Sequence, residues 1–211
     1  MPEREIPRMT SPLSLLLIAA AAVLATIAVA LPLVQITRDS ATATVNLTPS
    51  ATTTALATVP LTAGTVEATG DDEITVSLVA TELPGTPPRA VPPALKVLSQ
   101  AGTSLWALGL AAAAFLLARV LADLAAGRTF APAQARRFVG IAIAVLLCSA
   151  GADTVNYLNA RLLTDALGSP PSIAVTPYYS AIPIAIAAVT LVLAGAFRAG
   201  RRIEADTEGL V

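Results

Sequence analysis

Two polar side chains that could carry chemistry interrupt an apolar stretch of this 211-residue chain. Asp153 and Asn156 are three residues apart, so they share one face of a helix. An ionised carboxylate costs at least about 2.5 kcal/mol in lipid, so we expect Asp153 to face other helices or water. The pair could bind a ligand or an ion, or pass a proton. The alternative, which we favour, is a carboxylate in the outer headgroup layer or one bonded to a neighbouring helix.

A second group of polar residues borders the apolar stretches and forms a candidate cytoplasmic interaction face. Its members are Gly127, Arg128, Phe130, Arg136, Arg137, Arg198, Arg201, Arg202, Glu204 and Asp206. Gly127 is expected to end a helix, Phe130 to anchor the following turn, and Arg136 with Arg137 to meet lipid phosphates. The mixed charge of the last segment could dock a basic partner. The alternative, which we favour, is a collar of arginines at the headgroups followed by solvated acids.

Arg119 and Asp123 lie four residues apart, which predicts an ion pair on one face of a helix near the membrane boundary. We expect this pair to fix the depth of the helix in the bilayer rather than to form a functional site.

Several classes of chemistry are excluded by composition. Histidine is absent, which excludes His-based zinc sites and Ser-His-Asp triads. The single cysteine, Cys148, excludes an intrachain disulfide and is expected to be a small buried hydrophobe. No phosphate-binding loop or paired-cysteine motif is present. We therefore expect no enzymatic activity, no metal and no cofactor, and the net charge of −1 argues against direct binding of nucleic acid.

The composition is that of an integral membrane protein, because 55% of the residues are apolar and only 13% are charged. Four stretches reach the roughly 20 residues that a spanning helix needs. They are residues 13–34, 105–124, 138–157 and 179–197. The first could instead be a cleaved signal peptide. Its apolar run is longer than that of a signal, and three spans follow, so we favour a retained helix.

Basic and aromatic residues predict the orientation of the four spans. Eight arginines border the spans on the side that holds both termini: Arg4, Arg8, Arg128, Arg136, Arg137, Arg198, Arg201 and Arg202. The positive-inside rule therefore places the N-terminus (1–12), the connector (125–137) and the tail (198–211) in the cytoplasm, with the spans in the plasma membrane. The interfacial aromatic residues Trp106, Tyr157, Tyr178 and Tyr179 then lie near the outer helix ends, next to outer segments 35–104 and 158–178.

The long outer segment is predicted to contain a small sheet. Apolar and polar residues alternate over 42–47 and 74–81, which is typical of strands. Gly70–Asp72 would form a hairpin turn between 65–69 and 74–80, and the proline-rich 84–93 would form a stiff linker into the next helix. A Thr-rich tether is the alternative. The predicted fold is thus an all-α membrane protein, a bundle of four transmembrane helices with a small β-rich extracytoplasmic loop between the first two.

Three short motifs resemble those of a bacterial four-span membrane family catalogued as domain of unknown function 2975. They are 124–130 (LAAGRTF), 133–140 (AQARRFVG) and the tail 197–211, which begins FRAG, continues through acidic residues and ends in Val. The family has proline where this chain has Thr129. The resemblance implies four helices, an outer loop between the first two, and a small helix-turn-helix regulator of the Cro type as a partner.

These observations lead to two functional expectations. The first is a non-enzymatic bacterial membrane protein that couples an extracytoplasmic loop to a cytoplasmic regulatory partner. The alternative is a subunit of a small-solute or ion transporter or channel that uses Asp153 and Asn156. Four spans are few for a pore, so the alternative requires a homo-oligomer.

Overall fold

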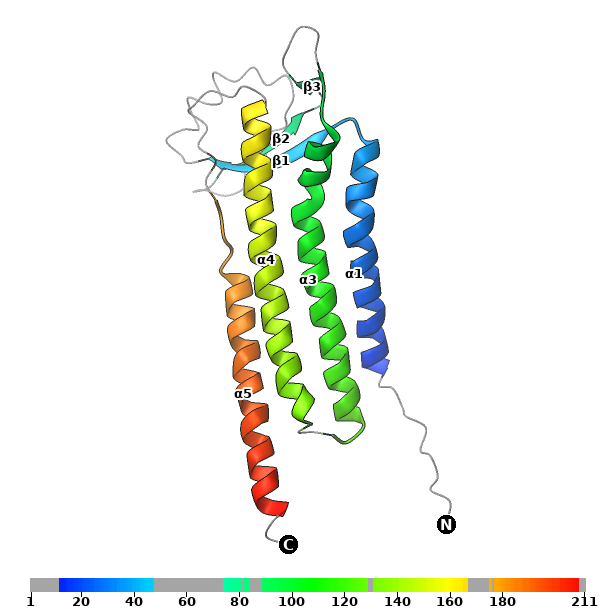
Figure 1. The fold of residues 1–211 in the computed structure, drawn as a ribbon, viewed down its shortest axis with the longest axis vertical. Coiled ribbons are helices and arrows are strands. Elements are labelled where there is room, and N and C mark those ends of the chain that lie inside the picture. The colour runs from blue at the N-terminus through cyan, green and yellow to red at the C-terminus, as the bar shows by residue number, and fades with distance from the viewer. Residues whose placement is uncertain are drawn as a thin grey trace. The chain divides into compact units, whose positions relative to one another are not determined.

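A computed structural model describes residues 12–47, 74–80, 82–83, 89–128, 131–166, 175 and 177–208. The described chain contains four long helices (Figure 1): α1 (Pro12–Thr37), α3 (Pro93–Ala125), α4 (Pro132–Ala166) and α5 (Ile182–Glu208). All four are long and apolar enough to cross a membrane. The prediction of four helices with the length and composition of membrane spans is confirmed.

Proline marks the beginning of these helices. Pro12, Pro93 and Pro132 are the first residues of α1, α3 and α4, and Pro183 is the second residue of α5. Proline suits the first turn of a helix because its fixed φ is helical and the backbone N–H that it lacks would have no helical partner there. The helix starts are therefore encoded locally, by single residues.

The helices are longer than the predicted spans. α3 has 33 residues and α4 has 35, so each is about 50 Å long, whereas the hydrocarbon layer is about 30 Å thick. In α4 the helix continues through 158–166, part of the predicted outer loop, because this stretch is rich in the helix formers Ala, Leu and Arg. α5 begins three residues after the predicted span and continues through 198–208. The helix therefore does not end where the apolar sequence ends.

The chain forms two compact units. The helical unit comprises the chain up to Thr26, Ala107–Ser149 and Ser180–Val211; the mixed unit, which holds the strands, comprises Ile27–Trp106 and Ala150–Tyr179. α1, α3 and α4 each contribute to both units.

Side chains of α3, α4 and α5 form the core of the helical unit. Its buried members are Val120, Phe138, Ile141, Val145 and Ala194. Phe138 of α4 stacks on Phe197 of α5 with ring centroids 5.1 Å apart. Cys148 is half-buried, and a Cβ at Gly109 would lie 2.6 Å from its Cβ, so α3 and α4 approach closely at this level. Val192 of α5 is 72% exposed, which suits a surface that contacts lipid rather than water.

The mixed unit contains two small antiparallel sheets. β1 (Ala41–Leu47) pairs with β2 (Ile74–Ala80), and β3 (Glu82–Leu83) pairs with β4 (Arg89–Ala90). The two strands predicted from alternation thus form, although they pair with each other across a long connection. The predicted hairpin partner at 65–69 and its turn lie outside the described residues, as does the first half of the proline-rich linker. In its second half, Arg89–Ala90 form β4 and Pro93 already belongs to α3.

β1 is attached to the last turns of α4. The buried cluster that joins them contains Ala41, Ala43, Ala80, Val91, Ala160 and Leu163. The amide Nδ2 of Asn159 donates a hydrogen bond to the backbone oxygen of Thr42 over 2.9 Å. Small alanine side chains on the strands allow this close approach, so part of segment 35–104 is an ordered element that packs against a helix.

Candidate functional site

The turn between α3 and α4 is shaped by a glycine. Gly127 has a φ of +75°, in the left-handed region that favours glycine. The backbone N–H of Arg128 donates to the oxygen of Asp123, and that of Gly127 donates to the oxygen of Leu124, both over 3.0 Å. This pattern is a Schellman motif, which satisfies carbonyl groups at the end of the helix. Gly127 therefore ends α3 as predicted. Phe130 lies outside the described residues.

Asp123 is the centre of an ion-pair network at this turn. The residue is only 9% exposed. Its Oδ1 accepts a hydrogen bond from Arg128, and its Oδ2 accepts one from Arg137 of α4. Arg137 also donates to the backbone oxygen of Arg119 over 3.1 Å. One carboxylate therefore links the end of α3, the turn and the first turns of α4.

The predicted ion pair between Arg119 and Asp123 is wrong. The Arg119 guanidinium lies over the ring of Phe115, 5.2 Å from its centroid. The spacing of four residues identifies neighbours on one helix, whereas the Asp123 carboxylate is occupied by two arginines that follow it in the chain. The contribution of Arg119 to the network is its backbone oxygen.

Gln134 is a member of this turn that the sequence analysis missed. Its side chain is fully buried, and its Nε2 donates to the backbone oxygen of Arg128 over 2.8 Å. Its backbone N–H donates to the oxygen of Ala131 over 2.9 Å. Gln134 is the third residue of α4, a position at which Gln is favoured because its side-chain oxygen can accept from the preceding backbone; here Nε2 makes the bond, and the buried Oε1 has no partner among the described residues. That preference was the available signal.

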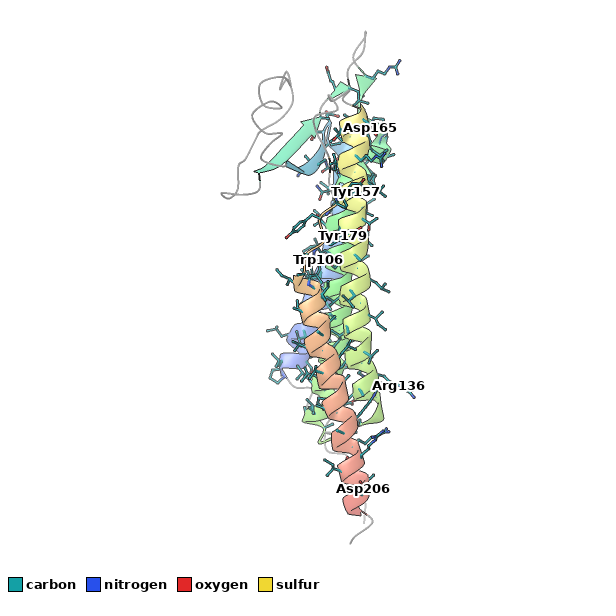
Figure 2. All side chains as sticks on the ribbon, turned by 90° about the vertical axis from the view of Figure 1, so that its left-hand side faces the viewer. Trp106, Arg136, Tyr157, Asp165, Tyr179 and Asp206 are labelled. Atoms are coloured by element: carbon teal, nitrogen blue, oxygen red, sulfur yellow. The ribbon has the colours of Figure 1, made fainter. Side chains whose placement is uncertain are left out.

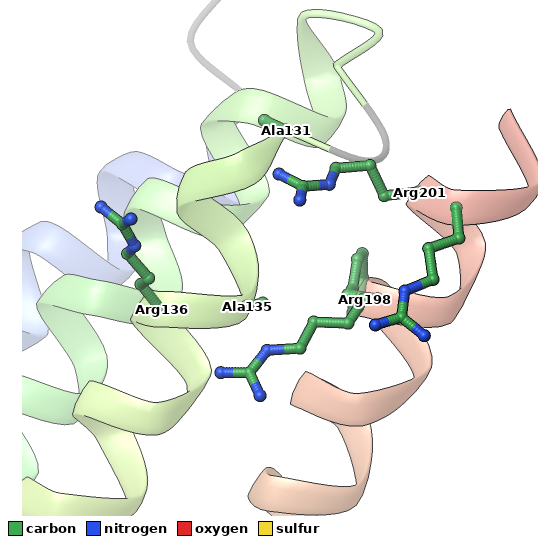
Figure 3. A pocket seen from close by; sticks show the side chains of 7 residues that line it. Ala131, Ala135, Arg136, Arg198 and Arg201 are labelled. Atoms are coloured by element: carbon green, nitrogen blue, oxygen red, sulfur yellow. The ribbon is translucent and has the colours of Figure 1, made fainter. Parts of the chain in front are cut away.

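A cavity of about 300 Å³ lies between the first turns of α4 and the C-terminal part of α5 (Figure 3). We call it the arginine cavity. Its lining residues are Ala131, Ala135, Arg136, Phe197, Arg198, Arg201 and Arg202. All four arginines are exposed, and none forms an ion pair within the described part of the chain. Among the described residues, the lining thus carries four positive charges and no carboxylate.

The predicted interaction face is therefore two sites of different character. Arg128 and Arg137 bind Asp123, whereas Arg136 joins the tail arginines at the arginine cavity. Glu204 and Asp206 are exposed on the turn of α5 that follows the cavity arginines. Asp206 and Arg136 are labelled in Figure 2.

The polar strip on α4 in the mixed unit has three members with different surroundings. Asp153 is half-buried, and Asn156 is exposed. A Cβ at Gly102 of α3 would lie 2.0 Å from the Asn156 Oδ1, so this amide rests on the α3 backbone. Asn159 is 3% exposed and binds β1. The structure thus uses two of the three residues to join α4 to its neighbours. Tyr157 lies in the same part of α4 (Figure 2).

Comparison of the chain with family models, with curated proteins and with solved structures found no match. The family resemblance drawn from the tail and connector motifs therefore stays a prediction.

Proposed function

We propose that this protein is a non-enzymatic, multi-pass protein of the plasma membrane that couples its extracytoplasmic sheet to a cytoplasmic partner. The observation that supports the proposal is that one continuous helix, α4, takes part in both polar assemblies. Asn159 in its last turns binds β1, and Arg137 in its first turns binds Asp123. Coupling requires that α4 have two states that a partner binds differently, and these two contacts are where we expect such states to differ.

The proposed topology places both termini and the α3–α4 turn in the cytoplasm. It is supported by the arginines gathered in the helical unit: Arg128, Arg136, Arg137, Arg198, Arg201 and Arg202. The aromatic residues Trp106, Tyr157 and Tyr179 belong to the mixed unit (Figure 2), where interfacial side chains would meet the outer headgroups.

The acidic end of α5 is the proposed docking element for the partner. Glu204 and Asp206 are exposed and follow the last arginine of the cavity by two and four residues. A partner with a basic surface fits this charge. A small helix-turn-helix regulator is the class of partner that the family resemblance implies, and its binding would hold the regulator at the membrane.

Co-purification in mild detergent from native cells tests this proposal. The wild-type chain is expected to retain a cytoplasmic protein that mass spectrometry identifies, and the double variant Glu204→Gln/Asp206→Asn is expected to lose it. Asp165→Asn is the matched control, because Asp165 is also an exposed acid but lies in the mixed unit (Figure 2). Equal recovery with all three proteins, or no partner with the wild type, would contradict the proposal.

A transport subunit is the second candidate, and Asp153 favours it. This carboxylate is partly exposed on an apolar helix and has no hydrogen bond or ion pair among the residues that the structure describes. In a homo-oligomer such a group could bind a permeating ion. Ion flux into proteoliposomes is expected to fall in Asp153→Asn if this candidate is correct. Unchanged flux would rule out a role of Asp153 in transport.

A further inference from the structure

The arginine cavity brings together like charges that form no ion pair with an acid among the residues that the structure describes. Arg198, Arg201 and Arg202 are spaced by three and four residues along α5, so they share one face of that helix. Like charges at these spacings repel and destabilise a helix. An anion in the cavity would remove this repulsion.

The first turn of α4 adds positive potential from the other wall. Ala131 and Ala135 line the cavity where α4 begins at Pro132. The dipole of a helix favours anions, phosphate in particular, at the N-terminus, and this contribution remains although Pro132 has no backbone N–H and that of Gln134 is bonded to Ala131. The arginine side chains and the helix terminus are separate features of the chain, and both select for negative charge at the same place.

The geometry of the side chains suits a tetrahedral oxyanion. In Figure 3, Arg201 reaches from α5 toward Ala131, and Arg198 extends toward α4 beside Ala135. A guanidinium can donate two parallel hydrogen bonds to a phosphate, and this arrangement is stronger than a neutral contact. The guanidinium of Arg136 points away from α5 in the same view, so its stem lines the cavity while its charge lies farther from the centre.

The cavity also has apolar lining at the end of the spanning part of α5. Phe197, which stacks on Phe138, and the two alanines form this part of the wall. A phosphodiester whose organic arms continue into the bilayer would contact both the arginines and these apolar groups. Basic pockets between membrane helices on the cytoplasmic side bind anionic lipid headgroups in this way.

We propose that the arginine cavity is a binding site for a phosphate group, carried by the headgroup of an anionic phospholipid. The site lies on α4 and α5 and does not depend on the existence of a cytoplasmic partner. It assigns Arg198 and Arg201 as the main ligands to the phosphate oxygens and Arg136 as a weaker contributor.

Native mass spectrometry of the whole chain released from nanodiscs tests the proposal. The nanodiscs contain phosphatidylcholine with an equal share of phosphatidylglycerol, and the preference of bound lipid is the readout. The wild type is expected to retain phosphatidylglycerol about tenfold over phosphatidylcholine, and Arg198→Gln/Arg201→Gln is expected to lose most of that preference. Arg161→Gln is the matched control, since Arg161 is an exposed arginine of α4 in the mixed unit.

Two further variants separate charge from geometry. Arg198→Lys/Arg201→Lys keeps the charge but not the paired donors, so it is expected to retain an intermediate preference. Arg136→Gln is expected to reduce the preference less than the double variant does. A preference that is the same in the wild type and in Arg198→Gln/Arg201→Gln would overturn the proposal, as would an equal loss in Arg161→Gln.

A second arm distinguishes lipid from soluble phosphate. Inorganic phosphate at millimolar concentration is added before release, and the lipid adducts are counted again. The lipid is expected to stay bound, because a free phosphate gains no apolar contact with Phe197. Complete displacement of the lipid by inorganic phosphate would overturn the assignment to a phospholipid.

Discussion

Arg136 and Arg137 are neighbours in the sequence, yet the structure places them in opposite electrostatic surroundings. Arg137 binds the nearly buried Asp123 and a backbone oxygen, and its side chain is only 23% exposed. Arg136 lines a cavity with three other arginines and, among the described residues, no acid. The difference comes from the Asp123 carboxylate on α3, which forms ion pairs with Arg128 and Arg137. The four arginines of the cavity have no such ion pair in the described part of the chain and are available to bind an anion.

The largest expected effect comes from removing that carboxylate. Asp123→Asn would remove both ion pairs and leave Arg137 with only its bond to the Arg119 backbone oxygen, so we expect the free energy of unfolding to fall by about 3 kcal/mol. Thermal unfolding in detergent, followed by circular dichroism, measures the loss. Asp206→Asn, at an exposed position on α5, serves as the control and should leave the transition unchanged. Equal transitions in the two variants would show that the network does not stabilise the fold.

A direct comparison of the two neighbouring arginines gives the next effect. Arg137→Gln removes charged hydrogen bonds while Asp123 keeps Arg128, so a loss of about 1.5 kcal/mol is expected. Arg136→Gln should cost less than about 0.5 kcal/mol, because no ion pair is broken. The same unfolding measurement applies to both. Equal losses of unfolding free energy would mean that Arg136 stabilises the fold as much as Arg137 does.

The smallest effect concerns the glycine that shapes the ion-paired turn. Gly127→Ala places a Cβ at a φ of +75°, so we expect a loss of about 1 kcal/mol. Gly195 of α5 is the matched control: a Cβ there meets nothing within 4 Å, and alanine favours the helix. Gly195→Ala should therefore be neutral or stabilising. The same loss in both variants would indicate that the backbone conformation of the turn is not what matters.

Composition and apolar run length were sufficient to predict the four helices, because a bilayer imposes one length on every spanning segment. The alternation of apolar and polar residues was sufficient to predict β1 and β2. The pairing of these strands was not predictable from local turns, since it joins Ala41 to Ala80 across a long connection.

The partners of Asp123 were beyond sequence reasoning for a related reason. Spacing along one helix pointed to Arg119, whereas Arg137 comes from the following helix, fourteen residues later. Which arginine reaches the carboxylate depends on the turn that Gly127 permits and on how α3 and α4 pack. The distinction between paired and cavity-lining arginines is therefore a property of tertiary structure.

Because α5 is continuous, the acidic side chains at its end point in defined directions around the helix axis. Because the helix runs unbroken to Glu208, each residue after Arg202 is rotated by about 100° and advanced by about 1.5 Å from the one before. A single alanine inserted at Ile203 would preserve the net charge and leave the residues of the arginine cavity unchanged. It would nevertheless turn Asp206 by more than a quarter of a revolution about the helix axis. The direction in which the acidic side chains point can therefore be changed without changing their charge.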